Sequence, residues 1–264
     1  MILKIDSLVN PKIKNIVKLR DSSRGRKEQG LFLIEGHREI SLALKAGVEI
    51  ENLIYSPEYI KQELAIDEEK IIEVAKKVFD KVSYRENPDG FLAVAKSREH
   101  KLADLNLSAN PLLVVLEAVE KPGNLGAILR TADAIGLDAV IINDLKTDLY
   151  NPNVIRASQG AVFTVKVVLS SIEETAKFCE ENGIKILAAT PEATKEYTEI
   201  NYKSGCAIVM GAEDKGLSAK WLKAADDEIK ISMRGQIDSL NVSVSTAVVV
   251  FEAVRQRGKQ NHEL

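Results

Sequence analysis

The sequence contains few of the residues that form covalent or metal-linked scaffolds. Among its 264 residues there are only two cysteines, Cys179 and Cys206, and three histidines. The cysteines lie far apart in apolar or helical surroundings, which argues against a disulfide framework or a zinc site. The histidines are not spaced as metal ligands either. We therefore expect no metal and a reducing, cytoplasmic environment.

Long hydrophobic segments are also missing. No apolar run reaches the roughly 18 residues that span a bilayer, and residues 1–6 lack the apolar core of a signal peptide. Hydrophobic residues make up 45% and charged residues 28% of the chain, which is the balance of a globular protein with a sizeable core. We expect one large domain or two modest ones and no membrane partner.

The formal net charge of −3 argues by itself against nucleic-acid binding, but the charges are unevenly distributed. One short segment, residues 10–27, has a local charge of +6. It contains a single acid, Asp21, and seven basic residues: Lys12, Lys14, Lys18, Arg20, Arg24, Arg26 and Lys27. Such a patch can bind phosphates even on an acidic protein. The alternative, a solvated helix face followed by a loop, fits the charges equally well.

The first part of the sequence alternates helix and strand patterns. Asn10-Pro11 begins an amphipathic helix, residues 31–34 form a buried strand, and residues 36–46 form a helix that Gly47 ends. Shorter apolar runs follow up to residue 94. Residues 96–110 are polar without a long apolar run. We therefore expect a small α/β domain over residues 1–97 and a linker over 98–110.

From residue 111 to residue 264 the βα alternation is stronger. Near-continuous apolar runs, typical of a parallel sheet that is covered on both faces, predict strands at Leu112–Leu116, Ala139–Ile142, Val162–Val168, Ile186–Ala189, Ala207–Met210 and Ile229–Ile231. Helices are expected between them at 124–135, 171–182, 219–225 and 242–257. The pattern predicts an α/β fold in which helices enclose a parallel sheet.

The first of three polar, glycine-containing segments follows the strand that is predicted to end at Leu116. Pro122-Gly123 forms a turn, Asn124 is placed to cap a helix, and Arg130 comes six residues later. In open parallel sheets, ligands bind outside the carboxyl ends of the strands. Asn124 and Arg130 are therefore candidate site residues, although a capped helix with an arginine on its polar face would look the same.

The second segment, Gly211 to Gly216, contains Glu213, which could accept a ribose hydroxyl. It is neither a Gly-Lys-Ser/Thr phosphate loop nor a Gly-x-Gly-x-x-Gly motif, which argues against a nucleotide-binding dehydrogenase. The alternative is a plain connection to a helix that Ser218 caps.

The third segment contains Ser239, Asn241 and Ser243 around a helix N-terminus. Helix capping would account for only one of these three polar side chains, so the segment is a candidate site.

Together and in this order, the segments resemble the SpoU (TrmH-like) group of SPOUT RNA ribose methyltransferases. The matching motifs are Asn124-x-Gly126-x-x-x-Arg130-Thr131-Ala132, Gly211-x-Glu213-x-x-Gly216, and Ile231-x-Met233 followed by Ser239-Leu240-Asn241-Val242-Ser243. Arg156 to Ala161 resembles an intervening element of the family, and Phe32 to Glu39 resembles its RNA-binding domain. The sequence departs from the family at 244–247 and at Asp89-Gly90-Phe91, where relatives often have Gln-Gly-Ile.

The resemblance implies a C-terminal domain with a deep trefoil knot, preceded by a small L30e-like RNA-binding domain. It also implies a homodimer that uses S-adenosylmethionine to methylate a ribose 2′-hydroxyl of RNA, with 23S-type ribosomal RNA preferred over transfer RNA or a non-catalytic RNA-binding role. The implied catalytic residues are Asn124, Arg130, Ser239 and Asn241. The implied cofactor residues are Thr190, Gly211, Glu213, Gly216, Ile231, Met233 and Leu240, and the RNA contacts are Lys12, Lys14, Arg24, Arg26, Lys27 and His37.

Overall fold

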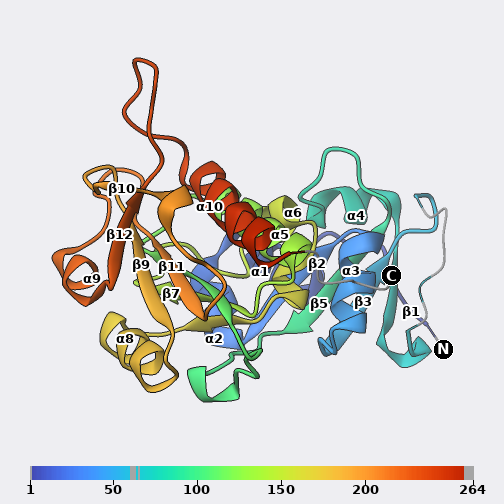
Figure 1. Cartoon of the computed structure of the whole chain (residues 1–264). Helices are drawn as coiled ribbons and strands as arrows, with labels where there is room; N and C mark the ends of the chain where they lie inside the picture. The colour runs from blue at the N-terminus through green and yellow to red at the C-terminus, as the bar shows by residue number, and fades with distance from the viewer. Residues whose placement is uncertain (1, 60–63, 65, 259–264) are drawn as a thin grey trace. The chain divides into compact units, whose positions relative to one another are not determined.

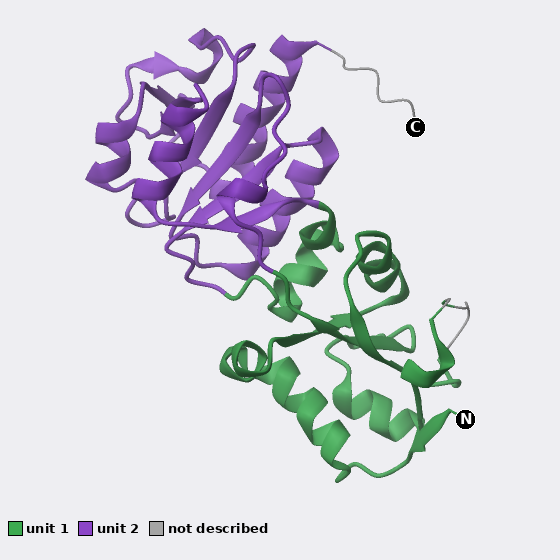
Figure 2. Ribbon diagram, turned by 90° about the horizontal axis from the view of Figure 1, so that it is seen from below, with its two compact units in different colours: residues 1–98, 148–164 green, residues 99–147, 165–264 purple. Residues whose placement is uncertain are grey.

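The computed structural model describes residues 2–59, 64 and 66–258. The chain divides into two compact units (Figure 2): unit 1 contains residues 1–98 and 148–164, and unit 2 contains residues 99–147 and 165–264. Residues 148–164 belong to unit 1, although they lie in the part of the sequence that predicts the C-terminal domain. The limits 1–97 and 111–264 stay predictions about which parts form separate domains.

Unit 1 contains a five-stranded mixed sheet in the order β1-β4-β3-β5-β2. The strands β1, β4 and β3 are parallel, whereas β5 runs antiparallel to β3 and β2. Their bounds are Leu3–Ile5 (β1), Leu31–Glu35 (β2), Ile50–Tyr55 (β3), Ile71–Val74 (β4) and Phe91–Lys96 (β5). The predicted strand at 31–34 is therefore confirmed.

The helices of unit 1 are α1 (Pro11–Asp21), α2 (Ser23–Gln29), α3 (His37–Lys45), α4 (Lys76–Val82), α6 (Pro152–Ser158) and α7 (Ala161–Thr164), with a 3₁₀ turn at Glu68–Lys70. The side chain of Asn10 caps α1 by accepting from the Lys12 amide at 2.9 Å. Proline follows in the first turn, where its missing N–H costs nothing. Ile13, Ile16 and Leu19 bury the apolar face of α1 against the sheet.

Unit 2 contains a seven-stranded sheet in the order β10-β12-β9-β11-β6-β7-β8 (Figure 1), in which every neighbouring pair is parallel. The strand bounds are Leu112–Glu117 (β6), Ala139–Asn143 (β7), Val167–Leu169 (β8), Lys185–Ala189 (β9), Lys195–Glu196 (β10), Cys206–Met210 (β11) and Asp227–Lys230 (β12). The predicted parallel sheet is therefore confirmed.

Helices cover both faces of this sheet. The helices α8 (Ile172–Glu181) and α9 (Ala219–Ala224) bury Cys179 and Trp221 against one face, together with the segment around the 3₁₀ turn Leu102–Asp104. The helices α5 (Pro122–Ile135) and α10 (Val242–Arg257) pack against each other and against β7 and β11. A further 3₁₀ turn spans Tyr197–Glu199. Unit 2 is thus the three-layer α/β/α structure that the sequence predicts.

One predicted strand, Val162–Val168, is wrong. Residues 161–164 form helix α7, and only Val167–Leu169 forms a strand. Gln159 and Gly160 both have positive φ angles, 53° and 88°, which turn the chain before α7. Phe163 is then buried against Phe32, with 5.9 Å between the ring centroids. A short apolar run cannot distinguish a buried helical turn from a strand by its pattern alone.

Candidate active site

The register of the unit 2 sheet brings the carboxyl ends of four adjacent strands to one level. Met210 of β11 lies opposite Ala189 of β9 and Leu116 of β6, while Ala189 lies opposite Ile229 of β12. The residues that follow, including Thr190 and Gly211, therefore emerge side by side. This is the edge at which open parallel sheets bind ligands.

A chain of hydrogen bonds joins the three sequence motifs at this edge. The Asn124 amide nitrogen donates to a Glu213 carboxylate oxygen, and the Asn241 amide nitrogen donates to Asn124 Oδ1 at 3.1 Å. Asn241 Oδ1 in turn accepts from the backbone N–H of Ser243 at 2.9 Å and from its hydroxyl at 2.6 Å. We call Asn124, Glu213, Asn241 and Ser243 the amide cluster. Because an amide has distinct donor and acceptor ends, these bonds fix the orientation of both asparagines.

Asn124 takes part in the cluster because it does not cap its helix. The prediction that Asn124 caps α5 is wrong: α5 begins at Pro122, the N-cap residue is Lys121, and Asn124 lies inside the first turn. Proline favours the first helical position because its φ angle is already helical. Asn241, by contrast, caps α10 through the Ser243 amide.

The loop from Gly211 to Ser218 folds back tightly on the end of β11. A Cβ atom on Gly211 would lie 2.6 Å from the Leu217 nitrogen and still closer to the Gly216 carbonyl, so a side chain at this position has no space. Gly216 has a φ angle of +63°, which glycine adopts without strain. These contacts explain why both glycines of the motif are needed.

Glu117 is a site residue that sequence reasoning missed. It is the last residue of β6 and is buried, and its Oε2 accepts from the Ser218 N–H at 2.8 Å. This bond fixes the far end of the Gly211–Ser218 loop. The signal available in the sequence was an acid directly after a buried apolar strand, at the edge where sites form.

The loop after β12 leads from the sheet edge to Asn241 at the start of α10. Ile231 and Met233 are partly buried, whereas Ser239 and Leu240 are exposed. The connection between β12 and α10 extends away from the sheet (Figure 1). Near its start, Glu196 accepts from the amide and hydroxyl of Ser232. Among the described residues no hydrogen bond joins Ser239 or Leu240 to Asn124. The contact of Glu196 with Ser232 was not predicted from the sequence.

Two other predicted positions lie near this edge. The Thr190 N–H donates to the Ile229 carbonyl at 2.9 Å, and the Thr190 hydroxyl donates to Glu192. Arg130 is exposed on α5. Within residues 2–59, 64 and 66–258, the Arg130 guanidinium has no hydrogen-bonding or ionic partner, so it is free to bind an anion.

The predicted RNA contacts in unit 1 differ in exposure. Lys12, Lys14, Arg24 and Lys27 are exposed, and His37 is partly buried beside Phe91, with 5.8 Å between the ring centroids. Arg26 is only 5% exposed, so its prediction as an RNA contact is wrong. Its Nε donates to Asp148 at 2.6 Å, and its Nη1 donates to the carbonyls of Leu19 at 2.6 Å and Arg20 at 3.0 Å.

The described groups at this edge offer hydrogen bonds and charge. No group of three or more His, Cys, Asp or Glu side chains that could hold a metal occurs in the described part of the chain. Burial raises the pKa of the Cys179 thiol to about 12 and also raises the pKa of Cys206, so neither thiol is a nucleophile. The edge can therefore orient a substrate and stabilise charge, using amides, backbone N–H groups and carboxylates.

The comparisons with known proteins agree with this arrangement. Residues 111–251 match the SpoU rRNA Methylase family, and residues 10–93 match the MRM3-like substrate binding domain. The 23S rRNA (guanosine(2553)-2′-O)-methyltransferase RlmP of Bacillus subtilis is 32% identical over 258 residues, which cover 94% of this chain and 98% of that protein.

Two solved structures extend the likeness to the whole fold. A crystal structure of an RNA 2′-O ribose methyltransferase is 40% identical, with a TM-score of 0.82 over 97% of this chain and 99% of that one. An AdoMet-bound rRNA methyltransferase from Sinorhizobium meliloti is 29% identical, with a TM-score of 0.88 over 98% of this chain and 99% of that one.

Fold and site together define an RNA methyltransferase of the SPOUT type. The chain belongs to the SpoU rRNA methylase family, which confirms the resemblance seen in the sequence.

Proposed function

We propose that this protein transfers a methyl group from S-adenosylmethionine to a ribose 2′-hydroxyl of 23S-type ribosomal RNA. The observation that carries the proposal is the amide cluster, in which Asn124, Glu213 and Asn241 from three separate motifs are hydrogen-bonded at the carboxyl edge of the sheet. The full-length match to RlmP, which is named for this reaction on 23S rRNA, supports the choice of RNA.

The loops at this edge fit a nucleoside cofactor. Three adjacent strands end in loops that start at Thr190, Gly211 and Ile231, and the backbone of Gly216 and Leu217 packs so closely on Gly211 that this position has no space for a side chain. We propose that Thr190, Gly211, Gly216, Ile231, Met233 and Leu240 hold the cofactor, with Glu213 linking this loop to Asn124. When bound, S-adenosylmethionine supplies a methyl group on a positively charged sulfur.

The protein's contribution to the rate is then alignment and charge stabilisation. A ribose hydroxyl is a weak nucleophile at neutral pH, so its oxygen must be held in line and its developing negative charge stabilised. Asn124 and Asn241 have orientations fixed by the cluster, and we assign them to positioning together with Ser239. The exposed guanidinium of Arg130 stabilises the alkoxide and clamps a neighbouring phosphate.

We do not assign Arg130 as a base, because a guanidinium keeps its proton at all pH values at which proteins stay folded. Arg130→Lys tests the assignment, since lysine retains the charge but loses the two-pronged geometry. We expect a methyl-transfer rate at least about tenfold lower. A variant with close to wild-type activity would exclude a bidentate role.

The RNA would also contact the exposed cations of α1 and α2. Replacing Arg24 and Lys27 together by glutamine should weaken RNA binding and reduce its salt dependence, because fewer counterions are released on binding. Unchanged affinity and unchanged salt dependence would make these side chains ordinary surface residues. Arg26 is left out of this test because it is buried.

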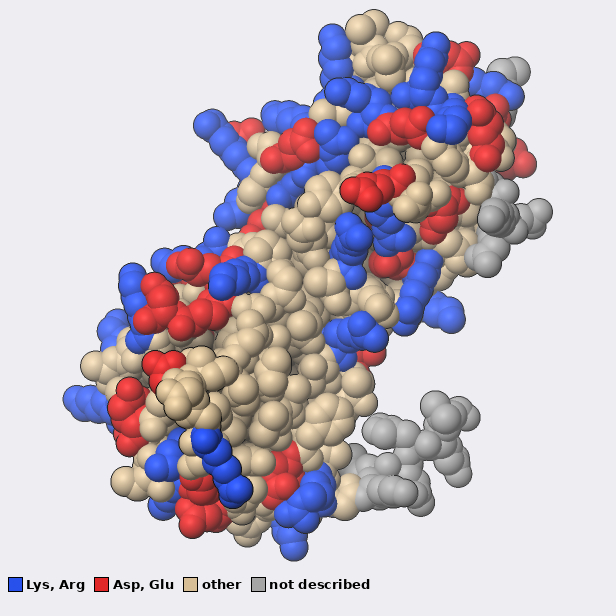
Figure 3. All heavy atoms as spheres, turned by 90° about the horizontal axis from the view of Figure 1, so that it is seen from above, with Lys and Arg blue, Asp and Glu red and all other residues tan. Residues whose placement is uncertain are grey.

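Homodimer formation is part of the proposal. Val244 and Phe251 on α10 are 47% and 53% exposed, which is unusual for large apolar side chains on one helix. One face of the molecule also has a broad area without charged side chains (Figure 3). We propose that a second copy covers α10 and that Arg130 acts across this interface. Sedimentation of Phe251→Lys, compared with the wild type, tests the interface.

Two further features complete the proposal. We propose a trefoil knot in unit 2, as the resemblance to the family implies, and the non-consecutive order β12-β9-β11-β6 is compatible with it. We also propose a cytoplasmic location, because both cysteines are free and buried. No described helix has the length and apolarity that crossing a bilayer requires.

Calorimetric titration with S-adenosylmethionine and mapping of ribose methylation in cells with and without the gene test the function directly. We expect cofactor binding and the loss of one 2′-O-methyl group from 23S-type RNA. A lost methyl group on transfer RNA would support the alternative substrate. Absence of cofactor binding would leave a non-catalytic RNA-binding protein.

A further inference from the structure

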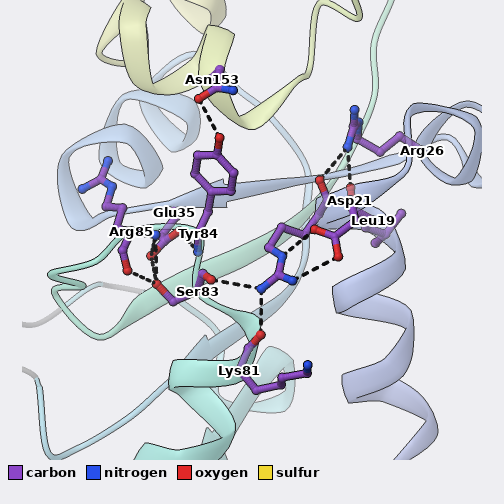
Figure 4. A network of polar contacts seen from close by, with 10 residues as sticks. Leu19, Asp21, Arg26, Glu35, Lys81, Ser83, Tyr84, Arg85 and Asn153 are labelled. Atoms are coloured by element: carbon purple, nitrogen blue, oxygen red, sulfur yellow. Dashed lines mark hydrogen bonds and ion pairs between the residues drawn. The ribbon is translucent and has the colours of Figure 1, made fainter.

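Unit 1 presents an exposed aromatic ring on a turn that is held unusually firmly. Tyr84 follows α4 and is 42% exposed, although it is a large aromatic side chain. Figure 4 shows that it points from its turn toward Asn153 of α6, and its hydroxyl donates to Asn153 Oδ1 at 2.8 Å. The ring is therefore fixed at its far end while much of its surface remains open to solvent.

The backbone of this turn is fixed by a carboxylate from β2. Glu35 accepts hydrogen bonds from the Ser83 hydroxyl at 2.5 Å, from the Tyr84 N–H at 2.7 Å and from the Arg85 N–H at 3.4 Å (Figure 4). Bonds of this kind, to an ionised acceptor, are stronger than bonds between neutral groups. The orientation of Tyr84 is thus set from the backbone as well as from the hydroxyl.

A guanidinium from α1 fixes the same turn from its other side. Arg20 Nη1 donates to the carbonyls of Lys81 at 2.7 Å and Ser83 at 3.1 Å, and the same side chain pairs with Asp21. Since two ionised side chains from different elements hold one surface turn, the turn is preorganised. Preorganisation reduces the entropy that a surface loses when it binds a partner.

The charged side chains around the ring, apart from one arginine, are held by hydrogen bonds or ion pairs. Arg20 pairs with Asp21, and Arg85 Nη2 pairs with Glu39 at 2.7 Å. Glu35 is occupied by its three donors. Arg156 of α6 lines the same narrow hollow as Tyr84 and is exposed, and it has no ionic partner among residues 2–59, 64 and 66–258. The surface therefore offers one open aromatic face and one free guanidinium.

We propose that Tyr84 is a stacking platform for one unpaired base of the RNA substrate and that Arg156 binds the adjacent phosphate. The hollow beside Tyr84 is lined by the buried side chains of Leu33, Leu92 and Ile155 and is too narrow for a base, so the base lies on the outer face of the ring. RNA-binding proteins use aromatic rings in this way for unstacked bases of loops and single strands. This inference rests on the proposed action on RNA and names a contact in unit 1 for it.

The test measures binding of a fluorescein-labelled 12-nucleotide oligoadenylate by anisotropy, over a range of salt concentrations. Tyr84→Leu should weaken binding about tenfold or more without changing the salt dependence, because stacking involves no counterions. Arg156→Gln should lower the slope of log affinity against log salt by about 0.7, the value for one phosphate contact on a single strand. Tyr84→Trp should keep the affinity, because it retains an aromatic face.

Controls separate stacking from misfolding and from general charge. Lys45→Gln removes an exposed cation at the end of α3 and should leave binding unchanged. A double-stranded RNA of the same length, whose bases are already stacked inside, should bind Tyr84→Leu as it binds the wild type. Tyr84→Trp should show fluorescence quenching on adding oligoadenylate, whereas the only native tryptophan, Trp221, is buried.

The stacking proposal would be contradicted if Tyr84→Leu bound the single strand with wild-type affinity. It would also be contradicted if this variant lost equal affinity for single-stranded and double-stranded RNA. The proposed function is measured separately, by methyl transfer from labelled S-adenosylmethionine to ribosomal RNA. If the wild type methylates RNA and Tyr84→Leu does so with unchanged RNA affinity, the platform fails and the function stands. If the wild type binds oligoadenylate through Tyr84 but transfers no methyl group, the function fails and the platform stands.

Discussion

Arg26 and Asp148 form the best-buried ion pair of unit 1, and removing one partner should destabilise the protein strongly. The side chains are 5% and 10% exposed, and 2.6 Å separates Arg26 Nε from Asp148 Oδ2. Asp148→Ala leaves a guanidinium that is still bonded to the carbonyls of Leu19 and Arg20 but has lost its counter-charge. A buried charge without a partner is the costly outcome.

The expected loss on Asp148→Ala is about 3–5 kcal/mol of unfolding free energy, the range for breaking one side of a buried pair. For a unit of this size it corresponds to a fall in melting temperature of about 10–20 °C. The double variant Arg26→Met with Asp148→Leu removes both charges and fills the space with apolar side chains. It should be more stable than Asp148→Ala, because no charge remains buried.

The measurement is thermal and urea unfolding of the wild type, Asp148→Ala and the double variant. Arg24 and Glu28 provide the matched surface control, since they also pair at 2.6 Å but are 88% and 47% exposed. Glu28→Ala should cost less than about 0.5 kcal/mol. If Asp148→Ala cost no more than Glu28→Ala, the pair would not be anchoring residues 148–164 to unit 1, and the burial argument would be refuted.

Three further predictions concern single side chains. Glu213→Ala should lower methyl transfer about 10- to 100-fold by freeing the Asn124 amide, and Glu213→Gln should restore most of it because the acceptor oxygen returns. Burial raises the pKa of Cys179 to about 12, so this thiol should not react with a disulfide reagent at pH 8 until the protein is unfolded. Hydrogen bonds from Arg255 and Gln256 lower the pKa of Glu252 from 4.5 to about 2. Glu252→Gln should therefore be less stable than the wild type above pH 4.5, and the difference should vanish as the pH falls toward 2 in unfolding curves.

Much of unit 2 could be predicted because its strands are marked by apolar runs of neighbouring residues. Runs such as Leu112–Leu116 and Ala207–Met210 are apolar throughout, as a strand covered on both faces requires. Because the motifs follow such strands, the sequence also predicted that they lie at the carboxyl edge of the sheet. The register that aligns Met210 with Ala189 and Leu116 agrees with that expectation.

The predictions that were wrong share a different cause. Each concerns a residue whose structural partner is distant in the sequence. In the sequence, Arg26 cannot be distinguished from the six other cations of residues 10–27. In the structure it is buried in an ion pair with Asp148, which is 122 residues away. Phe163 reads as part of a strand until its contact with Phe32 is known. Asn124 reads as a helix cap, although its partners Glu213 and Asn241 are 89 and 117 residues away. Composition and periodicity carry no information on such pairs.

The amide cluster also makes a prediction about the pH dependence of the reaction. Asn124 and Asn241 do not titrate, and no histidine or cysteine of the described residues bonds to the cluster. If Arg130 acts as a charged clamp and not as a base, no proton has to be removed from the protein before the methyl transfer. We therefore expect the maximal rate, measured with saturating RNA and cofactor, to be flat from about pH 6 to 9. A rate that rose tenfold per pH unit over this range would mean that a proton is lost before the rate-limiting step, and the clamp assignment for Arg130 would have to be abandoned. Arg130→Lys should then separate the two mechanisms, because a clamp variant is slower at every pH whereas a base variant changes the shape of the profile.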